Sequence, residues 1–154
     1  MLIMWTVKSF SELTATELHA ILKLRVAIFV VAQNRVYQEV DDDDLKARHI
    51  FKVVDGQVAA YARIFETPDG AVTIGRVVTN PAFRGQGLGS ELMTQVMAAI
   101  KQYYGDLPIK INAQEQVEGY YQKFGFETQG APFTYHSTPH ILMTHAAMNE
   151  PSKS

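Results

Sequence analysis

A short glycine-rich segment, Arg84-Gly85-Gln86-Gly87-Leu88-Gly89-Ser90, has the residue types of an anion-binding site. It follows a hydrophobic stretch typical of a strand, Val72 to Val78, and the turn signal Asn80-Pro81. The N–H groups of a first helical turn lack intrahelical partners, and the helix dipole adds positive potential there. Glycines let a phosphate approach the backbone closely. The helix that follows has apolar residues at helical spacing: Leu88, Leu92, Val96 and Ile100. We therefore expect a phosphate-bearing ligand on residues 84–90.

The spacing of these glycines separates the segment from two common phosphate-binding motifs. It does not have the interval of the dinucleotide fingerprint G-x-G-x-x-G, and it lacks the Gly-Lys-Ser/Thr ending of a P-loop. A glycine-rich turn by itself is more often a plain connection than a ligand site. Here the preceding strand, the Asn-Pro turn and the long amphipathic helix favour the site.

The composition limits the class of protein. The 154 residues have the size of one domain, 1–154, and 47% hydrophobic with 19% charged residues is typical of a globular protein. A net charge of −2 gives no reason to expect nucleic acid or a membrane surface as a partner. Without cysteine there is no disulfide, thiolate nucleophile or zinc–thiolate site. Because no apolar run approaches the roughly 18 residues of a membrane span, we expect a cytoplasmic protein. The tail, about residues 149–154, is expected to be disordered.

Hydrophobic periodicity predicts an α+β fold with the element order β-α-β-β-β-α-β-α-β-β. The predicted strands cover residues 3–8, 49–54, 57–65, 72–78, 109–113, 126–129 and 141–146, and the helices 14–31, 88–104 and 117–124. Thr14 and Glu17 have the spacing of a capping box, and Asp55-Gly56 is a hairpin signal. The strand at 109–113 should lie parallel to 72–78 through a right-handed crossover, with antiparallel pairing elsewhere.

The stretch from Phe29 to Leu45 has neither the helical nor the strand period and is rich in hydrogen-bonding side chains. Four consecutive aspartates, residues 41–44, favour a solvated loop or helix cap. Metal binding is the alternative, but no second ligand cluster has suitable spacing, so we expect no metal. The recognition candidates in this stretch are Gln33, Asn34, Tyr37 and Glu39, because binding residues tend to lie on loops. His49, at the start of a strand, is expected to be a hydrogen-bonded structural residue.

Arg84, Gly87 and Gly89 resemble the acyl-coenzyme A signature of the GNAT acetyltransferases, [Arg/Gln]-x-x-Gly-x-[Gly/Ala]. Residues 121–126, Tyr-Gln-Lys-Phe-Gly-Phe, are similar to the Tyr-x-Lys-x-Gly-Phe segment of that family. Two further stretches, residues 24–39 and 139–143, resemble its ElaA-like branch. The resemblance extends over about residues 5 to 146, nearly the whole chain.

The resemblance implies a GNAT-like fold: a mixed, mostly antiparallel sheet of about 6–7 strands, splayed at the cofactor site and flanked by about four helices. It implies acetyl-coenzyme A (acetyl-CoA) as donor and an amine as acceptor. The backbone at Val77 and Val78 would pair with the pantetheine arm, and the pyrophosphate would lie on residues 85–89. The implied cofactor-binding residues are Val77, Val78, Thr79, Arg84, Gly85, Gln86, Gly87, Leu88, Gly89, Ser90, Asn112 and Tyr121.

Two departures from the branch concern the acceptor side. The aspartate run stands where the branch has Asp-Gly, at Asp41-Asp42. Before Pro139, residues 135–138 stand where the branch commonly has an acidic pair. The identity of the acceptor therefore does not follow from the resemblance.

Attack of an amine on a thioester needs a deprotonated amine, stabilisation of the oxyanion and a proton for the leaving thiolate. The N–H of Val78 is our hypothesis for the oxyanion donor. Tyr121 is the candidate general acid, and a core aromatic beside Tyr120 is the alternative. The strand 72–78 carries no acidic residue, so the base would come from elsewhere. Glu39 and His140 are the candidates, against purely structural roles for each.

Three functional classes follow from these residues. The favoured one is an N-acetyltransferase acting on a primary amine of a small molecule or peptide by direct attack in a ternary complex. The alternatives are a non-catalytic acyl-CoA-binding or sensing domain and a phosphate-binding structural protein. Acidic residues near the pocket, Glu39 and Asp41, would suit a cationic acceptor. Edge-strand pairing into a homodimer is the expected assembly.

Overall fold

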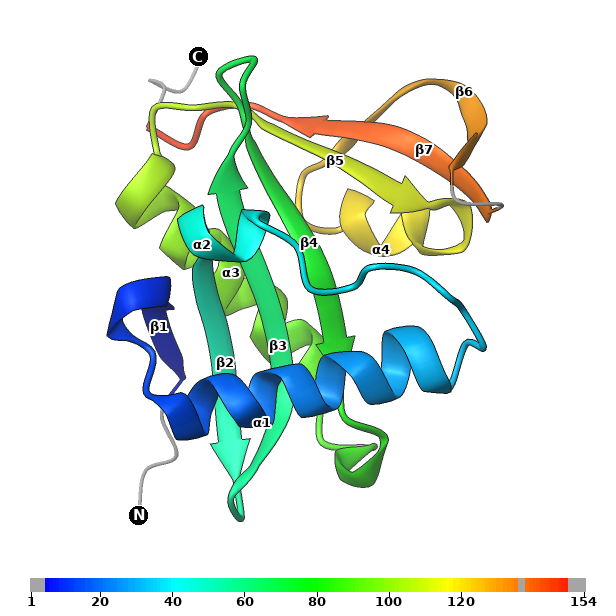
Figure 1. Cartoon of the computed structure of the whole chain (residues 1–154). Coiled ribbons are helices and arrows are strands. Elements are labelled where there is room, and N and C mark those ends of the chain that lie inside the picture. The colour runs from blue at the N-terminus through cyan, green and yellow to red at the C-terminus, as the bar shows by residue number, and fades with distance from the viewer. Residues whose placement is uncertain (1–4, 136–137, 150–154) are drawn as a thin grey trace. The chain divides into compact units, whose positions relative to one another are not determined.

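The computed structural model describes residues 5–135 and 138–149 (Figure 1). The chain forms two compact units, the first built from Met1–Phe65 and Ile74–Ala99 and the second from Glu66–Thr73 and Ile100–Ser154. The single domain predicted for 1–154 stays a prediction. The predicted disordered tail lies outside the described residues except for Asn149, whose N–H donates to the carbonyl of Gly105 at 2.9 Å.

Seven strands and four α-helices occur in the described residues, which confirms the α+β prediction. They are β1 (Thr6–Ser9), α1 (Ala15–Val26), α2 (Asp43–Lys46), β2 (Arg48–Val54), β3 (Gln57–Glu66), β4 (Val72–Thr79), α3 (Leu88–Tyr104), β5 (Ile109–Gln114), α4 (Glu118–Gln122), β6 (Glu127–Tyr135) and β7 (Thr138–His145). The strand order is β1-β2-β3-β4-β5-β7-β6. Val72 pairs in parallel with Ile109, as predicted. The predicted splay at Val77–Val78 stays a prediction.

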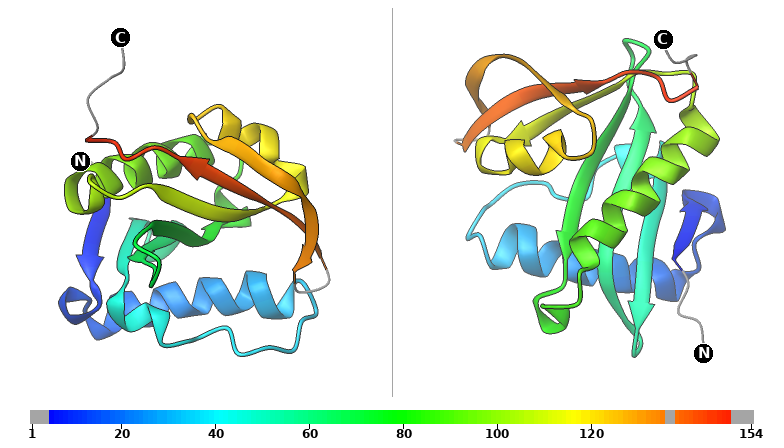
Figure 2. Two further views of the ribbon diagram at one scale, coloured as in Figure 1. Left: turned by 90° about the horizontal axis from the view of Figure 1, so that it is seen from above. Right: turned by 180° about the vertical axis from the view of Figure 1, so that it is seen from behind.

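In the first unit, the strands β1 to β4 lie between two helices. Helix α1 crosses one face of these strands, and the part of α3 in this unit covers the other (Figures 1 and 2). The capping box that begins α1 is confirmed, because Thr14 Oγ1 accepts from Glu17 N at 3.0 Å and Glu17 Oε1 from Thr14 N at 2.9 Å. The core between α1 and the sheet consists of Ile21, Leu24, Phe51, Val58, Tyr61 and Val78.

Asn34 ends the long helical segment. Helix α1 continues as a π-helical turn, Ala27–Val31, so helical structure ends where the sequence predicted it. Asn34 has φ +51°, its N–H bonds Val31 O at 3.2 Å, and Arg35 N–H bonds Val30 O at 3.0 Å. These two bonds around a left-handed residue form a Schellman motif, and asparagine tolerates that conformation better than most side chains. The chain then enters the irregular stretch that carries the recognition candidates.

In the second unit, β7 lies between β5 and β6 and pairs antiparallel with both. Strand β6 runs to Tyr135, beyond the predicted end at Gln129, and β7 begins at Thr138 rather than 141. The register shifts between Gln129 and Phe133, and Gly130 has φ +77°. Pro132 lies inside this shift, where no ladder N–H is required, so it does not end the strand.

None of the helices that the structure describes has the length and apolar character needed to cross a bilayer.

Candidate active site

The turn before α3 is fixed to the sheet by Asn80. Its side-chain oxygen accepts from Ala82 N at 3.0 Å and its Nδ2 donates to Val58 O at 3.1 Å. Its own N–H donates to Ala59 O at 2.8 Å. A short 3₁₀ turn, Pro81–Phe83, follows. The Asn-Pro signal in the sequence therefore corresponds to an anchored turn that delivers residue 84 at a fixed place beside β3.

Gly85 and Gly87 are required by the backbone and leave open space in front of it. Their φ angles are +80° and +69°, in the region that favours glycine. A Cβ built on either residue would meet no atom within 4 Å. Residues 84–87 are exposed, and α3, 17 residues long, begins directly after them. The segment therefore fits a phosphate group, which needs accessible backbone at the start of a long helix.

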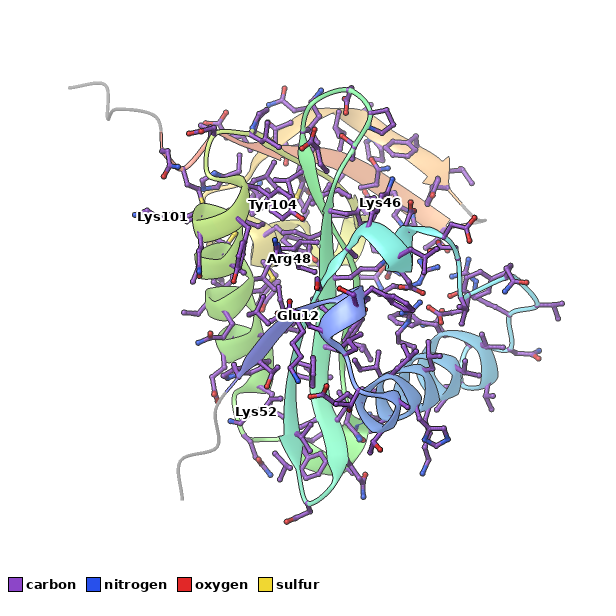
Figure 3. The ribbon with its side chains drawn as sticks, turned by 60° about the vertical axis from the view of Figure 1, so that its left-hand side comes forward. Glu12, Lys46, Arg48, Lys52, Lys101 and Tyr104 are labelled. Atoms are coloured by element: carbon purple, nitrogen blue, oxygen red, sulfur yellow. The ribbon has the colours of Figure 1, made fainter. Side chains whose placement is uncertain are left out.

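Glu91, in the first turn of α3, is an acidic residue close to this turn. Its Oε1 accepts from Trp5 Nε1 and from Lys52 Nζ, each at 3.2 Å. Lys52 reaches toward the beginning of α3 from β2 (Figure 3). The hydrogen bond from Trp5, and then that from Lys52, lower the pKa of the carboxyl group. The positive charge of Lys52 thus offsets an anion that would otherwise repel a bound phosphate.

Glu39 is buried, 3% exposed, between two arginines. Arg25 Nε lies 3.1 and 3.0 Å from its two carboxylate oxygens, and Arg76 Nε donates to Oε2 at 2.5 Å. The same two side chains bond the carbonyl of Glu39, Arg76 Nη2 at 2.8 Å and Arg25 Nη2 at 3.3 Å. Both side chain and main chain of Glu39 are therefore held by guanidinium groups.

These ion pairs extend into an arginine–carboxylate network, defined by Arg25, Arg63, Arg76, Glu39, Asp41 and Asp44. Arg25 bonds Asp44 through Nη1 and Nη2 at 2.8 and 3.1 Å. Arg63 Nη1 bonds Asp44 at 2.9 Å, and Arg63 bonds Asp41 at 2.7 and 3.1 Å. Burial alone would raise the pKa of Asp44, but the hydrogen bonds and charges of the two arginines outweigh it and lower that pKa.

The aspartate run is therefore divided between two environments. The solvated-loop or cap interpretation is right for Asp42, which is exposed before α2, and for Asp43, which pairs with Lys46 at 3.2 Å. Asp41 also acts as a cap, because its Oδ1 accepts from Asp43 N at 3.2 Å, although Arg63 binds the same carboxylate. The interpretation is wrong for Asp44, which is 4% exposed and bonded to two arginines. Consecutive residues of a helix point in different directions, so Asp43 and Asp44, the first two residues of α2, do not face the same surroundings.

The prediction that His49 is a hydrogen-bonded structural residue is confirmed, and the residue lies beside this network. It is fully buried, with Nδ1 2.6 Å from Tyr61 Oη and Nε2 3.0 Å from the carbonyl of Asp44. Because a carbonyl only accepts, Nε2 carries the proton and Nδ1 accepts from the tyrosine. Burial lowers the pKa of His49. The ring is therefore neutral and joins β2, β3 and α2.

Two of the predicted recognition residues meet at Arg76. The guanidinium of Arg76 lies 5.8 Å from the ring centre of Tyr37, and that of Arg35 lies 4.8 Å from the same ring. Arg76 also binds Glu39. Gln33 is exposed in the turn after the helix, and Asn34 provides the helix end. The structure thus brings Tyr37 and Glu39 together through a residue of β4.

Arg76 lies in an unusual backbone conformation within β4. Its φ is +52°, in the left-handed region that arginine rarely adopts. Two residues later, Val78 is buried in the core with Ile21 and Leu24 of α1. Val77 is half-buried and Thr79 exposed. The strand is therefore kinked directly before the backbone groups predicted to meet the donor.

In the second unit, Tyr121 on α4 is packed among aromatic rings. Its ring centre lies 5.6 Å from Tyr120 and 5.7 Å from Phe126, both edge-to-face. Burial, with a smaller contribution from Tyr120, raises the pKa of Tyr121 to about 12. The hydroxyl thus keeps its proton at neutral pH and is available as a donor. Its aromatic packing and a donor role are compatible.

His140 on β7 has a defined tautomer. Its Nδ1 lies 2.9 Å from the carbonyl of Thr138, so Nδ1 carries the proton and Nε2 of the neutral ring has the lone pair. Its ring lies 5.2 Å from Tyr135 and 6.4 Å from Phe133. The antiparallel register sets His140 opposite Gln114. Asn112, two residues before Gln114 and exposed, lies on the same face of the sheet.

Within the described ranges, no group of three His, Asp or Glu side chains could hold a metal ion.

The three arginines of the arginine–carboxylate network were not predicted as site residues from the sequence. Arg25 occupies a helical position between apolar residues, and it is fully buried. Arg63 and Arg76 stand inside otherwise apolar strands. Charged residues at positions where the pattern demands apolar ones, together with a run of aspartates, were the available signal, since buried charges require partners.

Comparison with known proteins agrees with this geometry. Residues 18–147 match the family described as acetyltransferase (GNAT) domain. Protein ElaA of Escherichia coli (strain K12) is 38% identical over 146 residues, covering 92% of this chain and 95% of that protein.

Solved structures give the same result. An acyl-CoA N-acyltransferase from Pseudomonas aeruginosa has a TM-score of 0.88 at 40% identity, and the match covers 94% of this chain and 100% of that one. Escherichia coli ElaA has a TM-score of 0.86 at 37% identity, covering 94% and 99%. The glycine turn before α3, the seven-stranded sheet and these likenesses together show that the chain belongs to the GNAT acetyltransferase family, in its ElaA-like branch.

Proposed function

We propose that this protein is an N-acetyltransferase that moves the acetyl group of acetyl-CoA to a primary amine of a small molecule or peptide. Attack is direct, in a ternary complex, without a covalent enzyme intermediate. The observation that carries the proposal is the turn at Gly85 and Gly87, whose positive φ angles and open surroundings precede a 17-residue helix in a chain of this family. The relative described as an acyl-CoA N-acyltransferase supports the donor class.

The donor would be held by main-chain groups more than by side chains. The N–H groups of residues 85–89 would bind the pyrophosphate, with Arg84, Gln86 and Ser90 at its border. Backbone groups of residues 77–79 would pair with the pantetheine arm, and Asn112 would contact it from β5. Bound acetyl-CoA supplies the thioester carbonyl that an amine attacks. The N–H of Val78 is the proposed donor to the oxyanion.

His140 is the better of the two candidate bases. The Nδ1–H bond to Thr138 leaves Nε2 able to accept the proton of the attacking amine. Glu39, by contrast, accepts hydrogen bonds from two arginine Nε–H groups. A proton transferred to that carboxylate would break buried ion pairs. We therefore assign proton acceptance to His140 and keep Glu39 in a positioning role.

Tyr121 is the proposed proton donor to the thiolate of coenzyme A. Its elevated pKa, about 12, keeps the hydroxyl protonated at neutral pH. The ring contacts with Tyr120 and Phe126 fix the direction of the hydroxyl, which a general acid requires.

The two acidic residues that would suit a cationic acceptor are neutralised by arginines in the structure. Glu39 and Asp41 each pair with arginines, so neither offers unbalanced negative charge. The network contains three arginines and three carboxylates and is neutral as a whole. The proposal therefore specifies an amine but no additional positive charge on the acceptor. Homodimerisation through an edge strand and a cytoplasmic location stay predictions.

Release of coenzyme A thiol in the presence of amines tests the proposal against the alternative, a non-catalytic acyl-CoA-binding domain. The chain has no cysteine, so a thiol-reactive dye reports only the product. We expect acetyl-CoA to bind and a subset of amines to stimulate thiol release, with acetylated amine formed in equal amount. Binding without stimulation by any amine in a broad panel would favour the sensing domain.

A further inference from the structure

Arg76 combines two features that the proposed reaction does not yet use. It is the residue at which β4 is kinked, with φ +52°, and its side chain is bonded to the stretch that precedes α2. A left-handed arginine persists in a strand only where its surroundings determine it, and such residues gather at functional sites. The contacts of its guanidinium show what those surroundings are.

The guanidinium of Arg76 is held from one side by Glu39 and Asp41. Its Nε donates to Glu39 Oε2 at 2.5 Å, and its Nη2 donates to Glu39 O at 2.8 Å. A longer contact of 3.4 Å joins Nη2 to Asp41. These bonds fix the end of the side chain in both direction and rotation, because a planar guanidinium with several bonded N–H groups cannot turn.

Glu39 is itself immobilised by the rest of the network. Arg25, fully buried on α1, bonds both its carboxylate oxygens, and Asp44 bonds Arg25 in turn. Arg63 on β3 joins Asp41 and Asp44. The anchor of Arg76 is therefore a largely buried cluster of several ion pairs rather than a single surface partner, so it can resist relaxation of the strand.

We propose that Arg76 and Glu39 are positioning residues for the transfer reaction. Their ion pair holds the left-handed backbone at residue 76 and through it the orientation of the peptide groups of Val77 and Val78. This inference rests on the proposed function, in which the N–H of Val78 faces the oxyanion. An alignment error of about 1 Å at such a group can cost on the order of 100-fold in rate.

We call the Arg76–Glu39 ion pair the clamp. Three substitutions distinguish its effect on backbone geometry from simple charge balance. Arg76→Gly allows φ +52° without steric cost but removes the clamp. Arg76→Lys keeps the charge but loses the planar fork. Glu39→Gln keeps the shape of the anchor and removes its charge. Arg35→Lys is the control, because Arg35 also stacks on Tyr37 and makes no ion pair with the network in the described part of the chain.

The first measurement uses the protein without ligand: amide chemical shifts and hydrogen exchange of residues 77 and 78 by NMR. We expect shifted resonances and faster exchange in Arg76→Gly and Glu39→Gln, a smaller change in Arg76→Lys and none in Arg35→Lys. Spectra that match wild type at residues 77 and 78 in both Arg76→Gly and Arg76→Lys would overturn the proposal.

The second measurement separates binding from turnover. In Arg76→Lys, kcat for an acetylated amine should fall about 10- to 100-fold. Acetyl-CoA affinity should fall less than kcat, because the glycine turn that would hold the pyrophosphate is unchanged and only the pairing of residues 77–79 with the pantetheine arm is disturbed. Added guanidinium chloride should not restore kcat in Arg76→Gly, because the free ion is not joined to the backbone. Restoration would show that only charge is needed and would overturn the clamp.

If the wild type acetylates no amine, the proposed function is contradicted. The effect of the clamp on the backbone at residues 77 and 78 is still tested by the NMR measurement, which needs no ligand.

Discussion

The guanidinium of Arg25 and the carboxylate of Asp44 form a doubly bonded ion pair, Nη1 to Oδ1 at 2.8 Å and Nη2 to Oδ2 at 3.1 Å. The side chain of Arg25 is 0% exposed and that of Asp44 5%. The two residues are 19 positions apart, one on α1 and the other on α2. The pair joins the helix that covers the sheet to the segment that carries Tyr37 and Glu39.

Removing one partner of this pair should destabilise the fold strongly. Asp44→Asn leaves Arg25 and Arg63 buried with an uncompensated charge, and we expect a loss of about 3–5 kcal/mol in the free energy of unfolding. Asp43→Asn is the matched control, because the ion pair of Asp43 with Lys46 lies near the surface, and its effect should stay within about 0.5 kcal/mol. Urea unfolding followed by circular dichroism measures both. Equal midpoints for the two variants would contradict the buried network.

Stability should decrease as the pH falls below about 6.5, the ordinary pKa of histidine. Burial lowers the pKa of His49, so the ring is neutral in the folded state and takes up a proton in the unfolded state at higher pH. The unfolded state then binds more protons, and its relative free energy falls as the pH decreases. In His49→Gln this part of the pH dependence should be lost. The urea midpoint, measured between pH 7.5 and 5, should depend on pH more steeply in wild type than in the variant. Equal slopes would refute the assignment of this pH dependence to His49.

A second loss of stability should follow only at much lower pH. The arginines hold the pKa of Asp44 and Asp41 below the ordinary value of about 3.9, against the opposing effect of burial. Their contribution to stability is complete above that value and is lost as the pH falls through the lowered pKa values. In Asp44→Asn this acid transition should be smaller than in wild type. An identical acid transition in both proteins would show that Asp44 does not contribute to it.

Tyr121→Phe should separate chemistry from packing. The phenyl ring keeps its contacts with Tyr120 and Phe126, so stability and acetyl-CoA affinity should stay close to wild type. If the hydroxyl donates the proton to the thiolate, kcat falls about 10²- to 10⁴-fold. Tyr120→Phe is the control, because it removes a neighbouring hydroxyl from the same aromatic cluster. Unchanged kcat in Tyr121→Phe would leave the residue with a packing role alone.

His140→Gln should lower kcat/KM about 10²- to 10⁴-fold, because glutamine cannot accept the proton of the attacking amine. His145→Gln is the matched control on the same strand, since His145 packs on Phe126 and its Nδ1 bonds the carbonyl of Ala146. A kcat/KM that is the same in His140→Gln and His145→Gln would assign the base elsewhere.

Features set by neighbouring residues could be predicted from the sequence. The capping box at Thr14, the hairpin at Asp55-Gly56 and the glycine turn before α3 each depend on conformations of a few consecutive residues. The predicted strand at 126–129 stops short of the end of β6, because only pairing with β7 shows that the chain continues through a register shift after Gln129.

The network could not be predicted because its partners are far apart in sequence. Arg76 and Glu39 are 37 residues apart, and Arg63 and Asp41 are 22 apart. Local pattern cannot say which members of an aspartate run are buried, since that depends on the arginines that face them. The recognition role of Tyr37 and Glu39 therefore stays a prediction, and the arginine side chains that hold Glu39 in place were not predicted.

We propose that the turn at Gly87 holds the phosphates of acetyl-CoA, and calorimetric titration of the Gly87→Glu variant with acetyl-CoA is the experiment to make first. Gly70→Glu is the matched control, because Gly70 also has a positive φ, +81° against +69°, and open space around its Cβ, but lies in the turn before β4. We predict that wild type and Gly70→Glu bind acetyl-CoA alike and that Gly87→Glu, folded by circular dichroism, does not bind. Equal affinity in all three proteins, or no binding by any of them, would contradict the proposal that the turn at Gly87 holds the phosphates.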